Sequence, residues 1–333
     1  MFRLDGFLLA LLLLTAPASA SAADCALSRV ASLDVVDAQD GGILVPVGIN
    51  GTELLLELDL AAERSVLSAA TADRLKLTRS RLPREMLFYH LSAAVHDGAT
   101  VAIVALGGAT GRDMLIPVVP ALVTNDPRAA GQLGLDLLSN FDVELDPASH
   151  KLNLFSPDHC QGQVVYWATS FTSVPLTVKG GILSVPVTLD GQGLTAGINT
   201  VRAASFLPLQ FAVTRFKLDR SMPSVVPAAD AAIRVPSYAI DIKPYRYAFT
   251  ELTLQAFAIR APSVLIYEFP YAFVMNGVYD PQCNNRVRIM NVTSSLTLAC
   301  GIDLYLGMQD LRKMHTYFAF KEGVLYLTAA DAK

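Results

Sequence analysis

Leu58-Asp59-Leu60-Ala61 is the stretch from which this sequence is best interpreted, because a second copy, Ile198-Asn199-Thr200-Val201, follows it along the chain. In each copy the central polar residue lies eight positions after a glycine, Gly51 or Gly191. Spacing of this kind indicates an internal repeat. Asp59 and Asn199 therefore occupy equivalent positions, and what Asp59 does as an acid its counterpart cannot do.

The similarity extends on both sides of these segments. A Gly-Gly-Ile-Leu run precedes each copy, at 41–44 and 180–183, and each copy ends on a Leu-Gly pair, at Gly134 and Gly307, with alternating apolar residues behind it. Chance similarity between two β-rich segments is the alternative that the residues alone leave open. We expect two lobes of one plan, at residues 35–157 and 166–330.

Signals for short β-strands dominate the chain. Asn50-Gly51 separates two strand-like runs, and Asp190-Gly191 separates two more. Both pairs tolerate positive φ angles and favour tight hairpins. We therefore predict an all-β fold. The strands are expected at 44–49, 54–58, 100–106, 114–119, 141–145, 152–155, 185–189, 194–198, 247–254 and 263–267, short helices at 136–140 and 309–313, and helices or irregular turns at 68–77 and 209–218.

The first 23 residues are typical of a secretory signal peptide. Arg3 precedes an apolar run at 7–14, and small residues follow at 18–23. The run is shorter than the ~20 apolar residues that span a bilayer, so we expect an exported chain, periplasmic or secreted, without a stable membrane anchor after cleavage. The net charge is −4 and the basic residues are dispersed, which disfavours nucleic acid as a partner.

Four cysteines in an exported chain favour disulfides. Three pairings are possible, and we expect Cys283 with Cys300 and Cys25 with Cys160. No two of them have a C-x-x-C spacing, and the five histidines show no metal spacing. No metal site and no cofactor are predicted.

With these motifs the chain resembles the aspartic peptidases of the retropepsin and pepsin superfamily. The matching residues are Leu58-Asp59-Leu60-Ala61, Ser65, and Gln132-Leu133-Gly134, with the second copy in the same order. The resemblance implies two tandem β-barrel lobes of the acid-protease type with a cleft between them. It also implies two catalytic aspartates, one from each lobe, that hold a water molecule and share one proton.

The most specific residues of that family pattern are altered here. Asp59 matches, but Leu60 and Ala61 replace the Thr and Gly that follow it; in the second lobe Thr200 matches, whereas Asn199 replaces the Asp and Val201 the Gly. An amide neither accepts nor releases a proton near neutral pH, so the shared-proton chemistry is lost. The resemblance makes Leu60, Ala61, Thr200 and Val201 residues of the binding site.

Two further tyrosines are candidates for contacts with a peptide. The family carries a hairpin over its cleft, and Tyr89 and Tyr238 lie in segments at a matching place, 86–95 and 237–249. Core packing explains such aromatic residues equally well. Asp136 and Asp142 are expected at a solvated helix start or strand end.

Two functions follow from the resemblance. The first is a peptide-binding pseudopeptidase that takes an extended peptide or protein segment between its lobes. The second is an active aspartic endopeptidase that uses Asp59, alone or in a homodimer that brings together Asp59 from two chains. A structural component of the cell envelope is a third possibility. We expect a monomer, with the homodimer as the alternative.

Overall fold

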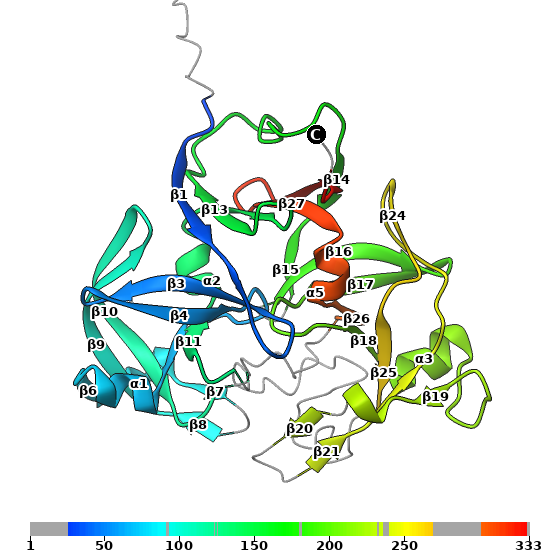
Figure 1. Cartoon of the computed structure of the whole chain (residues 1–333), viewed down its shortest axis with the longest axis horizontal. Helices are drawn as coiled ribbons and strands as arrows, with labels where there is room; N and C mark the ends of the chain where they lie inside the picture. Colours follow the sequence, from blue (N-terminus) through cyan, green and yellow to red (C-terminus); the bar gives the residue numbers. More distant parts are fainter. Residues whose placement is uncertain are drawn as a thin grey trace, which may run out of the picture.

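The structure is a computed structural model that describes residues 26–90, 93–122, 124, 126–179, 182–231, 233–235, 240–268 and 301–331. It is mostly β, with three large sheets and short helices. Figure 1 shows two β-rich lobes side by side, with a third sheet above and between them. The predicted all-β, two-lobed fold class is confirmed.

The first lobe is built around one curved sheet. Its strands follow the order β2-β3-β4-β11-β5-β10-β9-β6, and an additional pairing of β3 with β9 closes the sheet on itself. The strands are β2 (Val36–Asp37), β3 (Ile43–Ile49), β4 (Thr52–Leu58), β5 (Val66–Ser68), β6 (Thr78–Arg81), β9 (Asp97–Leu106), β10 (Ala109–Val119) and β11 (Ala129–Leu133), with helices α1 (Ala69–Arg74), η1 (Arg84–Met86) and α2 (Leu135–Leu138).

The second lobe repeats much of this plan. Its sheet has the order β19-β22-β25-β18-β26-β17-β16-β23-β24, and β15 pairs with β16 beside this path. The strands are β15 (Thr177–Lys179), β16 (Ile182–Leu189), β17 (Gln192–Ile198), β18 (Ser205–Pro208), β19 (Val226–Pro227), β22 (Pro244–Arg246), β23 (Glu251–Leu254), β24 (Phe257–Arg260), β25 (Val264–Tyr267) and β26 (Leu304–Leu306), with helices α3 (Leu209–Phe216), η2 (Ala229–Ala231) and α5 (Met308–Leu311).

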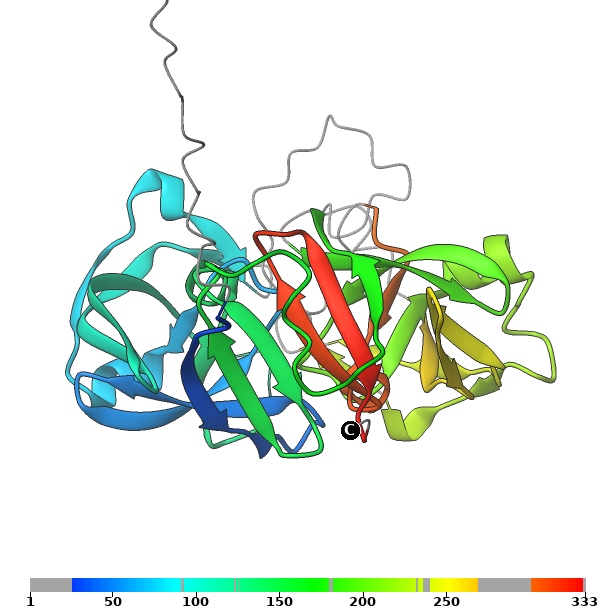
Figure 2. The same ribbon diagram turned by 90° about the horizontal axis from the view of Figure 1, so that it is seen from above.

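A six-stranded sheet joins the lobes. Its order is β1-β13-β12-β27-β28-β14, and the antiparallel pairing of β12 with β27 connects the end of one lobe to the end of the other. Seen from above, this sheet lies between the lobes (Figure 2). The strands are β1 (Arg29–Asp34), β12 (Asp142–Asp146), β13 (Lys151–Phe155), β14 (Thr172–Pro175), β27 (Met314–Ala319) and β28 (Val324–Ala329).

Tight turns determine the register of the paired hairpins. Asn50 and Gly51 adopt φ angles of 49° and 82°, and Asp190 and Gly191 adopt 43° and 80°. These left-handed conformations match the twist of two-residue hairpins. The predicted hairpins β3–β4 and β16–β17 are confirmed, with Ile49 opposite Thr52 and Leu189 opposite Gln192.

One predicted strand starts too early. We expected 247–254, but β22 ends at Arg246 and β23 begins only at Glu251. The chain turns between them, because the amide of Phe249 bonds to the carbonyl of Tyr247 and the carboxylate of Asp190 accepts the amides of Thr250 and Glu251. The apolar residues of this segment predicted a strand there. Hydrogen bonds to the side chain of Asp190, which is distant in the sequence, hold the backbone in a turn instead.

The expected solvation of Asp142 is wrong. Asp142 is fully buried in β12, where its carboxylate bonds to His159 and Tyr317 and accepts the amide of Phe320. Glu144, two residues along the same strand, is likewise buried. Its partners are Asn153, Tyr166 and His315. Buried carboxylates need such partners, so the six-stranded sheet carries a polar network where the sequence suggested a solvated end.

Two equivalent serines, one in each lobe, form the same pair of hydrogen bonds. Ser65 donates to Asp136 over 2.7 Å and accepts the amide of Gly134 over 2.9 Å. Ser205 donates to Asp310 over 2.6 Å and accepts the amide of Gly307 over 2.9 Å. Both glycines are needed here, because a Cβ on either would lie within 3 Å of backbone atoms of the facing segment.

Ser205→Ala is expected to lower the free energy of unfolding by about 1–3 kcal/mol, because the buried Gly307 amide loses its partner and Asp310 Oδ2 loses the serine hydroxyl, while Ser263 and Lys313 still bond only to Oδ1. Urea unfolding measures this loss. Ser173→Ala, on the exposed part of β14, is the control and is expected to change little. Equal stability of the two variants would contradict the proposed role of Ser205.

Candidate functional site

Asp59 and Asn199 lie at the ends of equivalent strands. Asp59 follows β4 and Asn199 follows β17, and their amides bond to the carbonyls of Leu133 and Leu306. The side-chain oxygen of each then accepts the amide two residues further on, that of Ala61 over 2.9 Å and that of Val201 over 3.2 Å. The two loops that carry Asp59 and Asn199, which we call the motif loops, therefore have the same local backbone geometry. They differ in that one carries a carboxyl and the other an amide.

Thr200 joins the two loops. Its hydroxyl donates to the carbonyl of Leu58 over 2.6 Å and accepts the amide of Leu60 over 3.1 Å. These two residues flank Asp59, so a single side chain of the second lobe holds both neighbours of the acid. Leu60 is the counterpart of Thr200 in the first lobe and has no hydroxyl to return such bonds.

Asp59 is fully buried. Burial raises the pKa of its carboxyl from 3.8 to about 6, although hydrogen bonds from the amide of Ala61 and the charge of Arg202 act in the opposite direction. Its Oδ2 accepts a hydrogen bond of 3.2 Å from the amide nitrogen of Gln132. Asp59 thus loses its proton only near pH 6, which is a suitable range for acid–base chemistry.

A second buried acid lies beside Asp59. Glu57 is two residues earlier on β4, so its side chain lies on the same face of the sheet. The Gln132 amide nitrogen lies 3.4 Å from Glu57 Oε2 and so bridges the two carboxyls. Burial raises the pKa of Glu57 well above its ordinary value, and the charges of Asp40 and Asp59 raise it further.

The second lobe contributes a cation to this cluster. The charge of Arg202, three residues after Asn199, lowers the pKa of both Glu57 and Asp59. Its backbone pairs with Gly41 in an isolated antiparallel bridge. A Cβ on Gly41 would lie 2.4 Å from that of Ala203, so glycine permits the close approach of the two lobes. The resemblance implies an acid from the second lobe. The structure instead has the amide of Asn199 and the guanidinium of Arg202.

The structure brings together most of the predicted site residues. Asp59, Leu60, Ala61, Asn199, Thr200 and Val201 are all buried at the contact of the two motif loops. Tyr89 lies in β7 (Phe88–His90), which forms a hairpin with β8 (Ala93–Val95). Tyr238 lies outside the described residues, between β20 (Ile233–Val235) and β21 (Ile240–Ile242). Figure 1 places both hairpins on the side away from the six-stranded sheet.

The disulfide pairings stay predictions. Cys160 is the only cysteine among the described residues and is not free. Cys25, Cys283 and Cys300 lie outside them, as does the predicted signal peptide. No helix in the described part of the chain is long and apolar enough to cross a membrane.

Sequence reasoning missed Glu57 and Arg202, and it identified Gln132 only as part of the family pattern, without a role in the site. The signal for Glu57 was its place in the otherwise apolar run Leu54-Leu55-Leu56-Glu57-Leu58, two residues before Asp59. Alternation along a strand puts such a residue on the same face as Asp59. Arg202 carried no comparable signal, because its proximity to Glu57 depends on how the two lobes meet.

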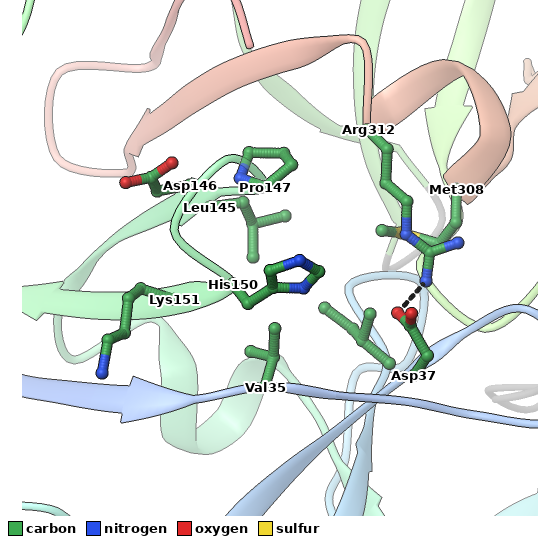
Figure 3. Close-up of a pocket in the computed structure, with 10 residues that line it drawn as sticks. Val35, Asp37, Leu145, Asp146, Pro147, His150, Lys151, Met308 and Arg312 are labelled. Atoms are coloured by element: carbon green, nitrogen blue, oxygen red, sulfur yellow. Dashed lines mark hydrogen bonds and ion pairs between the residues drawn. The ribbon is translucent and has the colours of Figure 1, made fainter. Parts of the chain in front are cut away.

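A separate pocket lies at the junction of the lobes. It has a volume of about 130 Å³ and is lined by Val35, Asp37, Ile43, Leu145, Asp146, Pro147, His150, Lys151, Met308 and Arg312. Arg312 forms an ion pair of 2.7 Å with Asp37 across this junction (Figure 3). Asp59 is not part of its lining. No cluster of His, Cys, Asp or Glu suited to a metal ion occurs among the residues described.

Part of this chain matches a known protein family. Residues 45–137, which include Asp59 and Gln132, match the family model described as aspartyl protease. A search of curated proteins returned no match. Solved structures that match include an aspartic proteinase from Irpex lacteus, 13% identical, covering 90% of this chain and 97% of that one with a TM-score of 0.47. Another is Basic 7S globulin from soybean, 11% identical, covering 92% and 96% with a TM-score of 0.47.

Thr200→Val is expected to lower the free energy of unfolding by at least about 2 kcal/mol, because the buried Leu60 amide and Leu58 carbonyl both lose their partner. Thr200→Ser keeps the hydroxyl and is the matched control. Chemical denaturation of the two variants measures the difference. If Val and Ser give the same stability, the hydroxyl does not hold the lobes together.

Asp59→Asn is expected to stabilise the protein at neutral pH. A folded-state pKa raised from 3.8 to about 6 means that the folded protein binds the proton more tightly than the unfolded chain. Stability therefore falls as pH rises from about 4 to above 6, and the variant avoids a loss of up to ~3 kcal/mol. Denaturation at pH 4 and pH 7.5 tests this, with the exposed Asp97→Asn as control. A stability difference independent of pH would refute it.

Proposed function

We propose that this chain, in which residues 45–137 match the aspartyl protease family model, is an exported, peptide-binding pseudopeptidase whose catalytic dyad is degraded to Asp59 and Asn199. The observation that carries the proposal is the environment of Asn199. Its side chain takes the place of the second acid, fully buried and bonded to the amide of Val201. With one acid in place of two, no proton is shared between the lobes.

The scaffold of the site argues for retained binding. Thr200 still holds the loop of Asp59, and the backbone bonds around both motif loops are intact. The hairpins β7–β8 and β20–β21 stand on the side of the molecule away from the six-stranded sheet (Figure 1). An extended peptide offers main-chain donors and acceptors along its whole length, so it suits a site between two β-rich lobes.

The active homodimer has less support. It requires the Asp59 loops of two chains to face each other, whereas Thr200 of the same chain already occupies the contact beside Asp59. The pairing of β12 with β27 holds the lobes together as well. Opening both contacts costs buried hydrogen bonds, so we propose a monomer.

The decisive experiment exposes a randomised peptide library to the purified mature chain between pH 3 and pH 7. We expect extended peptides to be retained by the immobilised protein and none to be cleaved, because Asn199 exchanges no proton. Asp59→Asn is the control for cleavage. Hydrolysis that disappears in this variant, or that a statyl-type inhibitor blocks, would establish a peptidase instead.

A variant with the second acid restored sharpens this test. Asn199→Asp restores a carboxyl at the position where the resemblance implies the second acid, while Leu60, Ala61 and Val201 stay unchanged. Acid cleavage by this variant alone would locate the lost step at Asn199. Failure of every peptide to bind any of the three proteins would overturn the proposed function.

A further inference from the structure

The outer end of the first lobe has an excess of positive charge, although the chain as a whole has a net charge of −4. Residues 73–85, which we call the basic edge, contain five cations and two acids and so have a net charge of +3. The acids are Asp73 and Glu85, and the cations, all of them exposed, are Arg74, Lys76, Arg79, Arg81 and Arg84. Figure 1 places α1 and β6 of this segment at the end of the first lobe that lies away from the second lobe.

Most cations of the basic edge have no counter-ion. Among the residues that the structure describes, only Arg79 of the five has an ion-pair partner, the carboxylate of Asp73 at 2.8 Å. Asp97 lies opposite Arg81 on β9 and forms no described ion pair with it. The other four cations are therefore free to form charge-assisted hydrogen bonds with carboxylates of another molecule.

The strand β6 also offers main-chain groups to a partner. It pairs with β9 at the end of its sheet, and no other strand in the described part of the chain pairs with its outer side. The amide of Leu82, the next residue, bonds to the carbonyl of His96 beside β9. Main-chain groups alternate in direction along an antiparallel strand, so the amides and carbonyls of Arg79 and Arg81 point away from β9. All four residues of β6 are exposed, which leaves this edge accessible.

The second lobe shows that the fold does not require this edge. The segments 75–77 and 216–218 are equivalent, because each has a lysine with a positive φ angle, 52° at Lys76 and 59° at Lys217, followed by a buried leucine. Beyond this point the first lobe forms β6, whereas residues 217–225 of the second lobe form no strand. Met222 and Val225 take the places of Arg81 and Arg84 there. The free cations and the free strand therefore occur together, in one lobe only.

We propose that β6 binds an acidic, extended segment of a partner protein, which adds to the first-lobe sheet as a further strand. The outward main-chain groups of Arg79 and Arg81 bond to the segment, as in other cases of strand addition. Acidic residues at alternate positions of the segment then lie on the same face as the two arginine side chains. The remaining cations of the basic edge attract the segment and favour it over neutral ones.

A second copy of this chain does not fit the same edge. Pairing of two β6 strands would bring arginine side chains together, and like charges on paired strands are destabilising. Charged residues on an edge strand commonly prevent such self-association. The surface is separate from the motif loops, so its binding does not depend on the proposed function.

Fluorescence anisotropy with labelled peptides of about six residues, the usual length of a strand, tests this proposal. One peptide carries two glutamates at alternate positions, and a second of the same composition carries them at adjacent positions. The alternating peptide is expected to bind about threefold tighter or more, because only its two acids share one face. Its N-methylated form, which lacks main-chain donors, is expected to bind at least about tenfold more weakly.

Two variants of the protein locate the site. Arg81→Gln is expected to weaken binding of the alternating peptide by about three- to fivefold, and Arg81→Glu by at least about tenfold. Arg112→Gln removes an exposed cation of β10 that has no described ion pair, and it should leave the affinity unchanged. Arg81 is itself exposed, so both of its variants are expected to fold.

Three results would overturn the proposal. The first is that the alternating peptide does not bind, or binds equally well to the Arg81 variants. The second is that both glutamate arrangements and the N-methylated peptide bind alike, which would reduce the effect to charge without strand addition. The third is that vesicles of anionic phospholipid bind in an Arg81-dependent way while no peptide does, which would make the basic edge a membrane contact.

Discussion

The hydroxyl of Thr200 is the interaction on which the site depends. A hydroxyl both donates and accepts, so one side chain of the second lobe holds the carbonyl of Leu58 and the amide of Leu60 at once. Both bonds are buried and have no competition from water. The continuous sheet through β12 and β27 holds the lobes at their other end. Together these contacts determine where Asp59 lies, and the side chain of Leu60, which has no hydroxyl, adds no hydrogen bond to them.

Equivalent backbone bonds support different side chains in the two lobes. The carbonyls of Ala62 and Arg202 accept the amides of Leu135 and Met308 at the same place in each lobe. Such bonds do not depend on the side chains, so the scaffold tolerates acids on one side and an arginine on the other. The backbone of the two lobes is nearly symmetric here, but the charged side chains are not. The carboxyls of Glu57 and Asp59 belong to the first lobe, and the positive charge of Arg202 belongs to the second.

The buried acids of the first lobe, Glu57 and Asp59, destabilise the folded protein at neutral pH. Burial raises the pKa of Glu57 and Asp59, which means that the ionised cluster costs free energy at neutral pH. Strongly shifted carboxyls gathered at one place are typical of functional sites. The Thr200 contact, by contrast, needs neither acid.

The sequence by itself determined the features that depend on neighbouring residues. Asn50-Gly51 and Asp190-Gly191 produce hairpins because their turn conformation is local, and equal spacing from Gly51 and Gly191 identified Asp59 and Asn199 as counterparts. Only the tertiary structure decided the burial of Asp142, the late start of β23, and the meeting of Glu57 with Asp40 and Arg202. These features depend on contacts between segments that are far apart in the sequence, and such contacts form only when the two lobes fold and meet.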